Sequence, residues 1–317
     1  MLPNPSALSL VRLKRFHMGT QWEIVVPSGT PNPVIWADLA YDALALEEAR
    51  LSVFHEHSEV SRLNRTPVGT PRRLSDELFL LLNRCWDWWQ RTDGCLDVAA
   101  GKMVQGWGFL HGPPRIPEER EREIWKAQGG MRRLELFEKS HSALWNEISG
   151  DLNLGAVGKG FGLDQMAKVL RRSDWPVVMI HGGRSSVIAW GKPPGENRGW
   201  RVALRHPRRD SILAEVEIID GAMGTTAPTY KHLNHQGQLL GHVLDPRGAW
   251  PAMMAETVSV LAPDATEADA LSTAIFVGGP ALAEKLVQNR NDLGVLYLPA
   301  NGPLRLFGCK SDCFQLK

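Results

Sequence analysis

Three short groups of residues in this sequence could carry chemistry, and the first is a glycine-rich stretch. Residues 151–164 (DLNLGAVGKGFGLD) contain four glycines, which let a ligand approach the backbone, and Lys159 adds a positive charge. The polar/apolar alternation of residues 151–154 predicts a short strand, and a helix is expected to begin near Phe161. Because a helix N-terminus attracts anions, we expect a phosphorylated ligand at this turn. The alternative is a tight turn that packs a helix closely on a sheet, since the stretch matches neither the P-loop nor the dinucleotide-binding pattern.

The other two groups contain a histidine and a carboxylate. His242 stands three residues before Asp245 and could act as a general base, although a histidine on an apolar strand is more often structural. Asp269 and Thr273 are four residues apart in a predicted helix, so their oxygen atoms lie on one face and could bind a hard cation such as Mg²⁺. The structural alternative is an aspartate near a helix N-terminus and a threonine that bonds its own helix backbone.

The elements that must position these groups are short strands and grouped helices. Period-two patterns and turn residues predict strands at 21–26, 176–181, 185–190, 200–204, 213–219, 257–261, 295–298 and 304–307. Helices are expected at 37–53, with Glu47 and Glu48 on the solvent side, and at 75–94, 118–128, 267–277 and 280–288. Residues 55–64 are expected to form a polar loop. Many strands joined by short turns favour an α+β fold over a doubly wound sheet.

The composition is that of an ordinary globular protein. Its 317 residues are 43% hydrophobic and 22% charged, enough for one large domain or two of moderate size, and the net charge of +1 gives no reason to expect nucleic acid as a partner. The four cysteines form no CxxC pair, which argues against a zinc site, and reduced thiols fit the spacing at least as well as disulfides. No apolar run is long enough for a signal peptide or a membrane span. The expected location is the cytoplasm as the sequence stands, or the periplasm if its N-terminus was trimmed.

These groups occur together with other motifs in a fixed order, and that order resembles the ApbE family, the FAD:protein FMN transferases. The resemblance covers about residues 15 to 280. Its motifs are MGT at 18–20, SEVSRLN at 58–64, TDGCLD at 92–97, WGF at 107–109, LGAVGKG at 154–160, GG at 182–183, HVLDPR at 242–247 and ADALSTA at 268–274. Each motif alone is weak, whereas the ordered set is specific.

The resemblance implies a single ApbE-like domain over residues 1–317, of α+β class with mainly antiparallel sheets and flanking helices, or two lobes with the FAD site between them. It also implies an enzyme that cleaves FAD with the help of Mg²⁺, releases AMP and attaches FMN by a phosphoester bond to a Thr or Ser of an acceptor protein. Those are the cofactors and partners that we expect.

Carried over residue by residue, the resemblance also implies roles for individual positions. The backbone carbonyl of Ala156 and the side chains of Asp269 and Thr273 match Mg²⁺ ligands, which are all oxygen atoms. His242 matches the general base that activates the acceptor hydroxyl. The positions that match contacts with FAD are Met18, Phe54, Cys95, Leu96, Asp97, Asn153, Lys159 and His242.

The sequence departs from the family pattern in three places. Residues 225–230 (TTAPTY) have one residue more than the family segment and lack its aspartate, Gly248 and Ala249 replace a Thr-Gly pair, and Asn153 replaces an aspartate. These departures keep two alternatives open. One is a Mg²⁺-dependent pyrophosphatase that splits FAD into FMN and AMP with water as the acceptor, and the other is a FAD-binding protein without catalysis.

Overall fold

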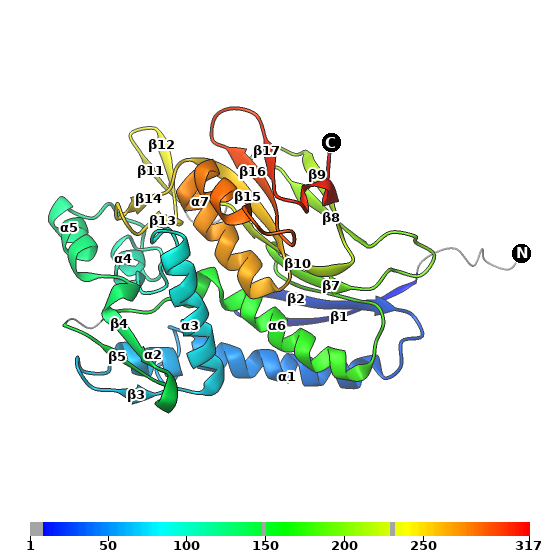
Figure 1. The fold of residues 1–317 in the computed structure, drawn as a ribbon, viewed down its shortest axis with the longest axis horizontal. Coiled ribbons are helices and arrows are strands. Elements are labelled where there is room, and N and C mark those ends of the chain that lie inside the picture. The colour runs from blue at the N-terminus through cyan, green and yellow to red at the C-terminus, as the bar shows by residue number, and fades with distance from the viewer. Residues whose placement is uncertain (1–8, 148–149, 229–231) are drawn as a thin grey trace, which may run out of the picture.

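An eight-stranded sheet forms the centre of the computed structural model, which describes residues 9–147, 150–228 and 232–317 (Figure 1). The strand order is β1-β2-β6-β7-β10-β15-β16-β17, and every neighbouring pair is antiparallel. The strands are β1 (Leu10–His17), β2 (Thr20–Pro27), β6 (Val178–Gly182), β7 (Ser186–Trp190), β10 (Asp220–Thr226), β15 (Ala255–Ala262), β16 (Gly294–Pro299) and β17 (Arg305–Phe307).

Each face of this sheet is covered by a different layer, because alternate residues of a strand point to opposite sides. On one face Ile24 and its neighbours pack in the main core against three helices, α1 (Pro33–Leu51), α6 (Gly158–Leu170) and α7 (Ala265–Val287). On the other face Val25 belongs to a second core, closed by the small sheet β18 (Phe314–Leu316), β9 (Ile212–Ile218) and β8 (Trp200–Arg205). Figure 1 shows the three helices side by side along the sheet.

The helices and small sheets not yet described gather at one end of the central sheet, on the left of Figure 1. They include the helices α2 (Glu59–Asn64), α3 (Asp76–Arg91), α4 (Gly101–Gly106) and α5 (Glu119–Gln128). Three small sheets lie there too: β3 (Arg72–Arg73), β5 (Ser142–Trp145) and β4 (Leu134–Phe137); β11 (His232–His235) and β12 (Gln238–Gly241); β13 (Leu244–Asp245) and β14 (Trp250–Pro251). Short 3₁₀ helices are η1 (Met131–Arg133), η2 (Glu138–Ser140), η3 (Leu154–Ala156), η4 (Arg171–Ser173) and η5 (Ser311–Cys313).

The predicted α+β class with mainly antiparallel sheets is confirmed, but several local predictions were wrong. Residues 151–154 form no strand; Asp151 makes one bridge to Ala100, and η3 follows. The expected loop at 55–64 contains α2, which begins where the Ser58 hydroxyl caps the chain. The two helices predicted at 267–288 are joined as α7, with a break at Gly279, whose φ is 75°. Strands β1 and β10 of the central sheet were not foreseen.

Glu47 was expected in solvent and is instead only 5% exposed. Burial raises its pKa, and Arg50 compensates by approaching its two carboxylate oxygens at 2.6 and 2.8 Å. The same guanidinium lies 3.5 Å from Glu59 and 3.4 Å from Glu77. Arg50 therefore ties α1 to the starts of α2 and α3.

All four cysteines lie in the described part of the chain and are free thiols. Within that same part, α7 is the one helix whose length and composition would allow it to cross a membrane. Buried residues make up 61% of its apolar window, so these properties are those of a core helix.

Candidate active site around Asp269

The first turns of α7 pack closely between α6 and β10, and two glycines without side chains allow this close packing. A Cβ atom on Gly160 would lie 2.1 Å from the carbonyl oxygen of Ala265, and one on Gly224 would lie 2.5 Å from the carbonyl carbon of Ala268. Any side chain at these positions would push the helix away. The glycine-rich turn thus brings η3 and α6 directly against α7, which carries Asp269.

The Asp269 carboxylate is buried at this junction, with 6% of the residue exposed. It accepts hydrogen bonds from the Gly160 N–H at 2.8 Å and from the Ser186 hydroxyl, which lies 2.8 and 3.0 Å from its two oxygens. Burial raises the pKa of Asp269 to about 6. The positive charge of Lys159 and the two hydrogen-bond donors lower this pKa and so offset part of the effect of burial. The group is therefore ionised at neutral pH, and it forms a buried negative centre that a cation would stabilise.

Lys159 lies near Asp269 without forming an ion pair with it. Its ammonium donates to the Ser185 hydroxyl, and that hydroxyl lies 3.3 Å from the Ser186 hydroxyl. Lys159 and Asp269 both lie in the described part of the chain, and the Lys159 ammonium makes no contact of ion-pair length with the Asp269 carboxylate. The ammonium is half-buried and remains close enough to lower the pKa of the carboxyl. One positive and one negative group thus stand side by side at the start of α6 and α7.

Thr273 follows Asp269 by one helical turn, and its hydroxyl lies 3.2 Å from the Thr226 hydroxyl at the end of β10. The third predicted ligand, Ala156, ends η3, which contacts α7. Among the described residues no group of three or more His, Cys, Asp and Glu side chains could hold a metal. The three predicted ligands are instead one carboxylate, one hydroxyl and one backbone carbonyl, a donor set that fits a hard cation completed by water and phosphate oxygens. Their role as ligands stays a prediction.

Asn64, the last residue of the SEVSRLN motif, fixes the chain that enters the turn. Its amide donates to the Leu152 carbonyl at 3.0 Å and to the Asp151 carboxylate at 2.6 Å, and it accepts from the Leu152 N–H at 2.8 Å. Asn153, predicted to contact FAD, donates its N–H to Val98 at 2.7 Å and accepts from the Gly155 N–H through its side chain at 2.9 Å. The Asn64 amide bonds both backbone groups of Leu152, as a neighbouring strand would. Such a contact leaves no pattern in the sequence, so the role of Asn64 was missed.

The predicted flavin segment at Cys95, Leu96 and Asp97 lies in the turn after α3. Cys95 and Leu96 are only 3% and 2% exposed as whole residues, so neither offers a ligand an open surface and their contact with FAD stays a prediction. The Asp97 carboxylate accepts from the N–H groups of Ala99 at 2.9 Å and Met131 at 3.1 Å, and burial raises its pKa to about 6. Asp97 therefore also joins two loops of the protein.

Met18 occupies the tight turn between β1 and β2, with φ values of 47° for Met18 and 70° for Gly19. The Glu48 carboxylate accepts the Met18 N–H at 2.7 Å and lies 3.0 Å from the His17 ring. Glu48 was expected to be solvated, and it instead fastens this turn to α1. The side chain of Met18 points to α6, since a Cβ on Gly162 would lie 3.5 Å from its methyl carbon.

Phe54 stands in the loop after α1 and is 63% exposed, with its ring 5.1 Å from that of His111 in an edge-on arrangement. An exposed aromatic ring is suited to stacking on a flavin. We expect Phe54→Ala to weaken FAD binding about three- to tenfold, the loss of about 1 kcal/mol of stacking. Titration of FAD fluorescence measures this, with Leu80→Ala on α3, 59% exposed, as a control that leaves affinity unchanged. Equal affinity of Phe54→Ala and wild type would remove Phe54 from the site.

His242 lies half-buried between β12 and β13. Its flanking residues Leu240 and Leu244 pack with Trp107 of the WGF motif in a separate small core. A Cβ on Gly241 would lie 2.4 Å from Pro228, so the chain that leaves β10 passes beside the histidine. In the altered segment 225–230, Thr226 contacts Thr273 and Pro228 lies beside Gly241. Thr229 and Tyr230 lie outside the described residues.

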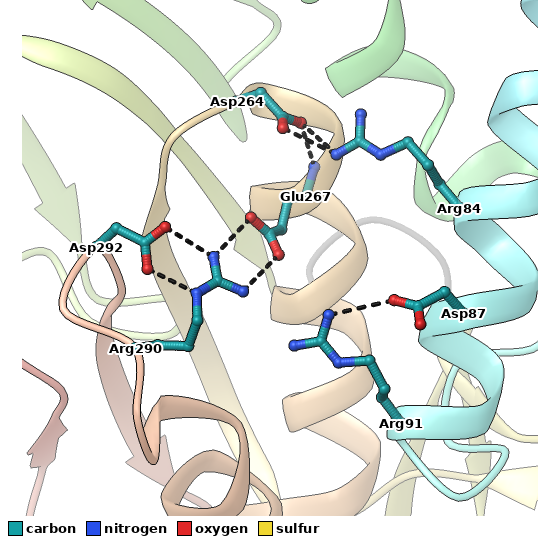
Figure 2. A network of polar contacts seen from close by, with 7 residues as sticks. All are labelled: Arg84, Asp87, Arg91, Asp264, Glu267, Arg290 and Asp292. Carbon is teal, nitrogen blue, oxygen red and sulfur yellow. Dashed lines mark hydrogen bonds and ion pairs between the residues drawn. The ribbon is translucent and has the colours of Figure 1, made fainter.

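A network of ion pairs anchors the N-terminus of α7 (Figure 2). Asp264 accepts the Glu267 N–H at 2.9 Å and receives Arg84 of α3 at 2.8 Å on both oxygens. Arg290 bridges Glu267, at 3.1 and 3.0 Å, and Asp292, at 2.6 and 2.9 Å. Because Asp269 lies five residues after Asp264 in the same helix, the network fixes the position of its carboxylate along the axis of α7.

Asp164 of α6 also caps the N-terminus of α7 through its carboxylate. Its carboxylate accepts the N–H groups of Ala265 and Thr266, each at 2.9 Å, and the Thr266 hydroxyl. We expect Asp164→Ala to lower the free energy of unfolding by about 2–3 kcal/mol, because buried helix donors lose their acceptor. Urea denaturation measures this, with Asp38→Ala, an exposed partner of Arg15, expected to change stability by less than about 0.5 kcal/mol. Equal losses for the two variants would contradict this role.

Comparison with known proteins agrees with the fold and the motifs. The model of the ApbE family matches residues 18–297. The chain is 27% identical over 311 residues to the FAD:protein FMN transferase of Escherichia coli (strain K12), covering 95% of this chain and 88% of that protein. The crystal structure of the ApbE protein from Thermotoga maritima superimposes with a TM-score of 0.88 at 24% identity, covering 98% of this chain and 100% of that one. The flavinyl transferase ApbE of Pseudomonas stutzeri superimposes with a TM-score of 0.84 at 22% identity, covering 97% of each chain. This chain belongs to the ApbE family.

Proposed function

We propose that this protein is a FAD:protein FMN transferase, which cleaves FAD, releases AMP and joins FMN to a Thr or Ser hydroxyl of an acceptor protein. The observation that carries the proposal is the buried Asp269 carboxylate beside the Lys159 ammonium, in a chain matched to the ApbE family over residues 18–297. The name of the Escherichia coli relative supports the same reaction.

Asp269, Thr273 and the Ala156 carbonyl would hold Mg²⁺, whose charge would stabilise the pyrophosphate during cleavage. Lys159 supplies a second positive charge that is held in place by Ser185 before the substrate binds. Such preorganised charge acts strongly in a site with little water.

The flavin end of FAD would lie toward Met18, Phe54, Asn153 and residues 95–97, between the central sheet and the part of the molecule that holds α2 to α5. Phe54 supplies the exposed ring for stacking. Asn153 and Val98 are already joined by a hydrogen bond of 2.7 Å, so the two flavin segments form one preassembled surface.

His242 would act on the acceptor. Its imidazole takes the proton of the Thr or Ser hydroxyl while that oxygen attacks the phosphorus of the FMN half. The new phosphoester bond forms as the bond between the two phosphates breaks, and AMP leaves with the electron pair of that bond.

The altered segment 225–230 is the observation behind the two alternatives. They are tested by incubating the protein with FAD, with Mg²⁺ or EDTA, and with or without an acceptor protein modified by a characterised relative. AMP matched by protein-bound FMN, and absent with EDTA, supports transfer. AMP matched by free FMN even with acceptor present selects the pyrophosphatase, and bound FAD without AMP selects the binding protein.

A further inference from the structure

Two consecutive serines at the start of β7 each contact a different charged group of the site. Ser186 is 0% exposed, and its hydroxyl lies 2.8 and 3.0 Å from the two carboxylate oxygens of Asp269. The Ser185 hydroxyl accepts a hydrogen bond from the Lys159 ammonium. The two hydroxyls are 3.3 Å apart, so they separate the ammonium from the carboxylate.

This separation keeps apart two opposite charges, the Lys159 ammonium and the Asp269 carboxylate, that attract each other. In a poorly solvated site an ammonium and a carboxylate attract each other strongly, and a direct pair would occupy the carboxylate lone pairs that a cation needs. Lys159 nevertheless remains on Ser185, and no contact of ion-pair length joins it to Asp269, both of which lie in the described part of the chain. The ammonium is thereby kept free to meet a phosphate group.

We infer that the Ser185–Ser186 pair is the positioning element of the metal and phosphate site, an inference that rests on the proposed function. Ser186 fixes the orientation of the Asp269 carboxylate and stabilises its negative charge. Ser185 holds Lys159 beside that carboxylate and prevents it from occupying the cation position. The two serines therefore affect cation binding by different routes, which double mutants can separate.

Removal of Ser186 acts on Asp269 directly. In Ser186→Ala the carboxylate keeps the Gly160 N–H and loses its only hydroxyl donor among the described contacts. We expect Mn²⁺, which binds oxygen sites in place of Mg²⁺, to bind about tenfold more weakly, whether or not Lys159 is present.

Removal of Ser185 acts through Lys159. In Ser185→Ala the ammonium loses its acceptor and moves onto Asp269, so Mn²⁺ binding weakens about tenfold as well. Here the loss disappears when Lys159→Met is added, since no cation remains to compete. Rescue by a second substitution is a readout that general damage to the fold would not give.

The experiment is a Mn²⁺ titration of the FAD-free protein followed by electron paramagnetic resonance. Asp269→Asn defines binding outside the site. Ser142→Ala is the matched control, because Ser142 is also buried, at 6%, but its hydroxyl bonds Ser140 in the separate β5 sheet. We expect wild-type affinity for the control, wild-type or higher affinity for Ser185→Ala/Lys159→Met, and weaker binding for Ser185→Ala, Ser186→Ala and Ser186→Ala/Lys159→Met.

Other outcomes overturn the inference. Wild-type Mn²⁺ affinity in both single serine variants does so, as does a Ser185→Ala loss that Lys159→Met fails to restore, or a wild type without Asp269-dependent Mn²⁺ binding. Release of AMP from FAD is measured separately on the wild type. Serine-dependent Mn²⁺ binding without AMP release would leave the inference standing and reject the proposed function, and AMP release without serine dependence would do the reverse.

Discussion

Asp269→Asn is expected to lower the rate of AMP release from FAD by about 100-fold or more, because it removes a charged cation ligand worth about 3 kcal/mol of stabilisation. The substitution keeps the size of the side chain. Its amide oxygen can still accept the Gly160 N–H, and its amino group can donate to the Ser186 hydroxyl. The rate is measured by chromatography of AMP over a range of Mg²⁺ concentrations.

The fold of this variant should survive, which provides the control. Burial raises the pKa of Asp269 to about 6, so at neutral pH the ionised form is less favourable in the folded protein than in the unfolded chain. A neutral amide removes that penalty, and the midpoint of thermal unfolding is expected to stay unchanged or to rise. An Asp269→Asn protein that releases AMP at the wild-type rate would contradict the assignment of this residue.

His242→Ala is expected to slow transfer of FMN to the acceptor by about 10²- to 10⁴-fold, the usual contribution of a positioned general base. Affinity for FAD should change much less than the transfer rate, although His242 also matches a FAD contact, because a general base acts in the transfer step rather than in substrate binding. Covalent flavin is measured by in-gel fluorescence of the acceptor, and FAD affinity by fluorescence titration.

Two comparisons separate a base from a structural residue at this position. His235→Ala removes a half-buried histidine of β11 in the neighbouring hairpin and should leave transfer unchanged. Added imidazole should restore part of the rate to His242→Ala, since a free base can enter the space that the side chain leaves. Full transfer by His242→Ala without imidazole would assign the proton transfer to another group.

Local signals in the sequence predicted several elements well. The α3 helix begins after Ser75, whose hydroxyl accepts the Leu78 N–H, because capping depends on a few neighbouring residues. Strands such as β9 show the alternation of a half-buried surface. The family itself was identified from ordered motifs, and the family match over residues 18–297 confirms it.

Features that depend on distant partners could not be predicted. Strand β10 (DGAMGTT) has two glycines and reads as a loop, yet Gly224 is required for contact with Ala268 of α7. Glu47 is buried because Arg50 compensates its charge. Ser186 reads as an ordinary strand residue until the carboxylate of α7 is seen opposite to it.

Mass spectrometry of the acceptor protein tests the central claim most directly. The purified protein is incubated with FAD, Mg²⁺ and an acceptor protein modified by a characterised relative, and the acceptor is then digested and its peptides are sequenced. The account predicts one peptide heavier by one FMN group in phosphoester linkage on a Thr or Ser, with one AMP formed for each modified acceptor. An unmodified acceptor, with FAD recovered intact or converted to free FMN, would contradict it.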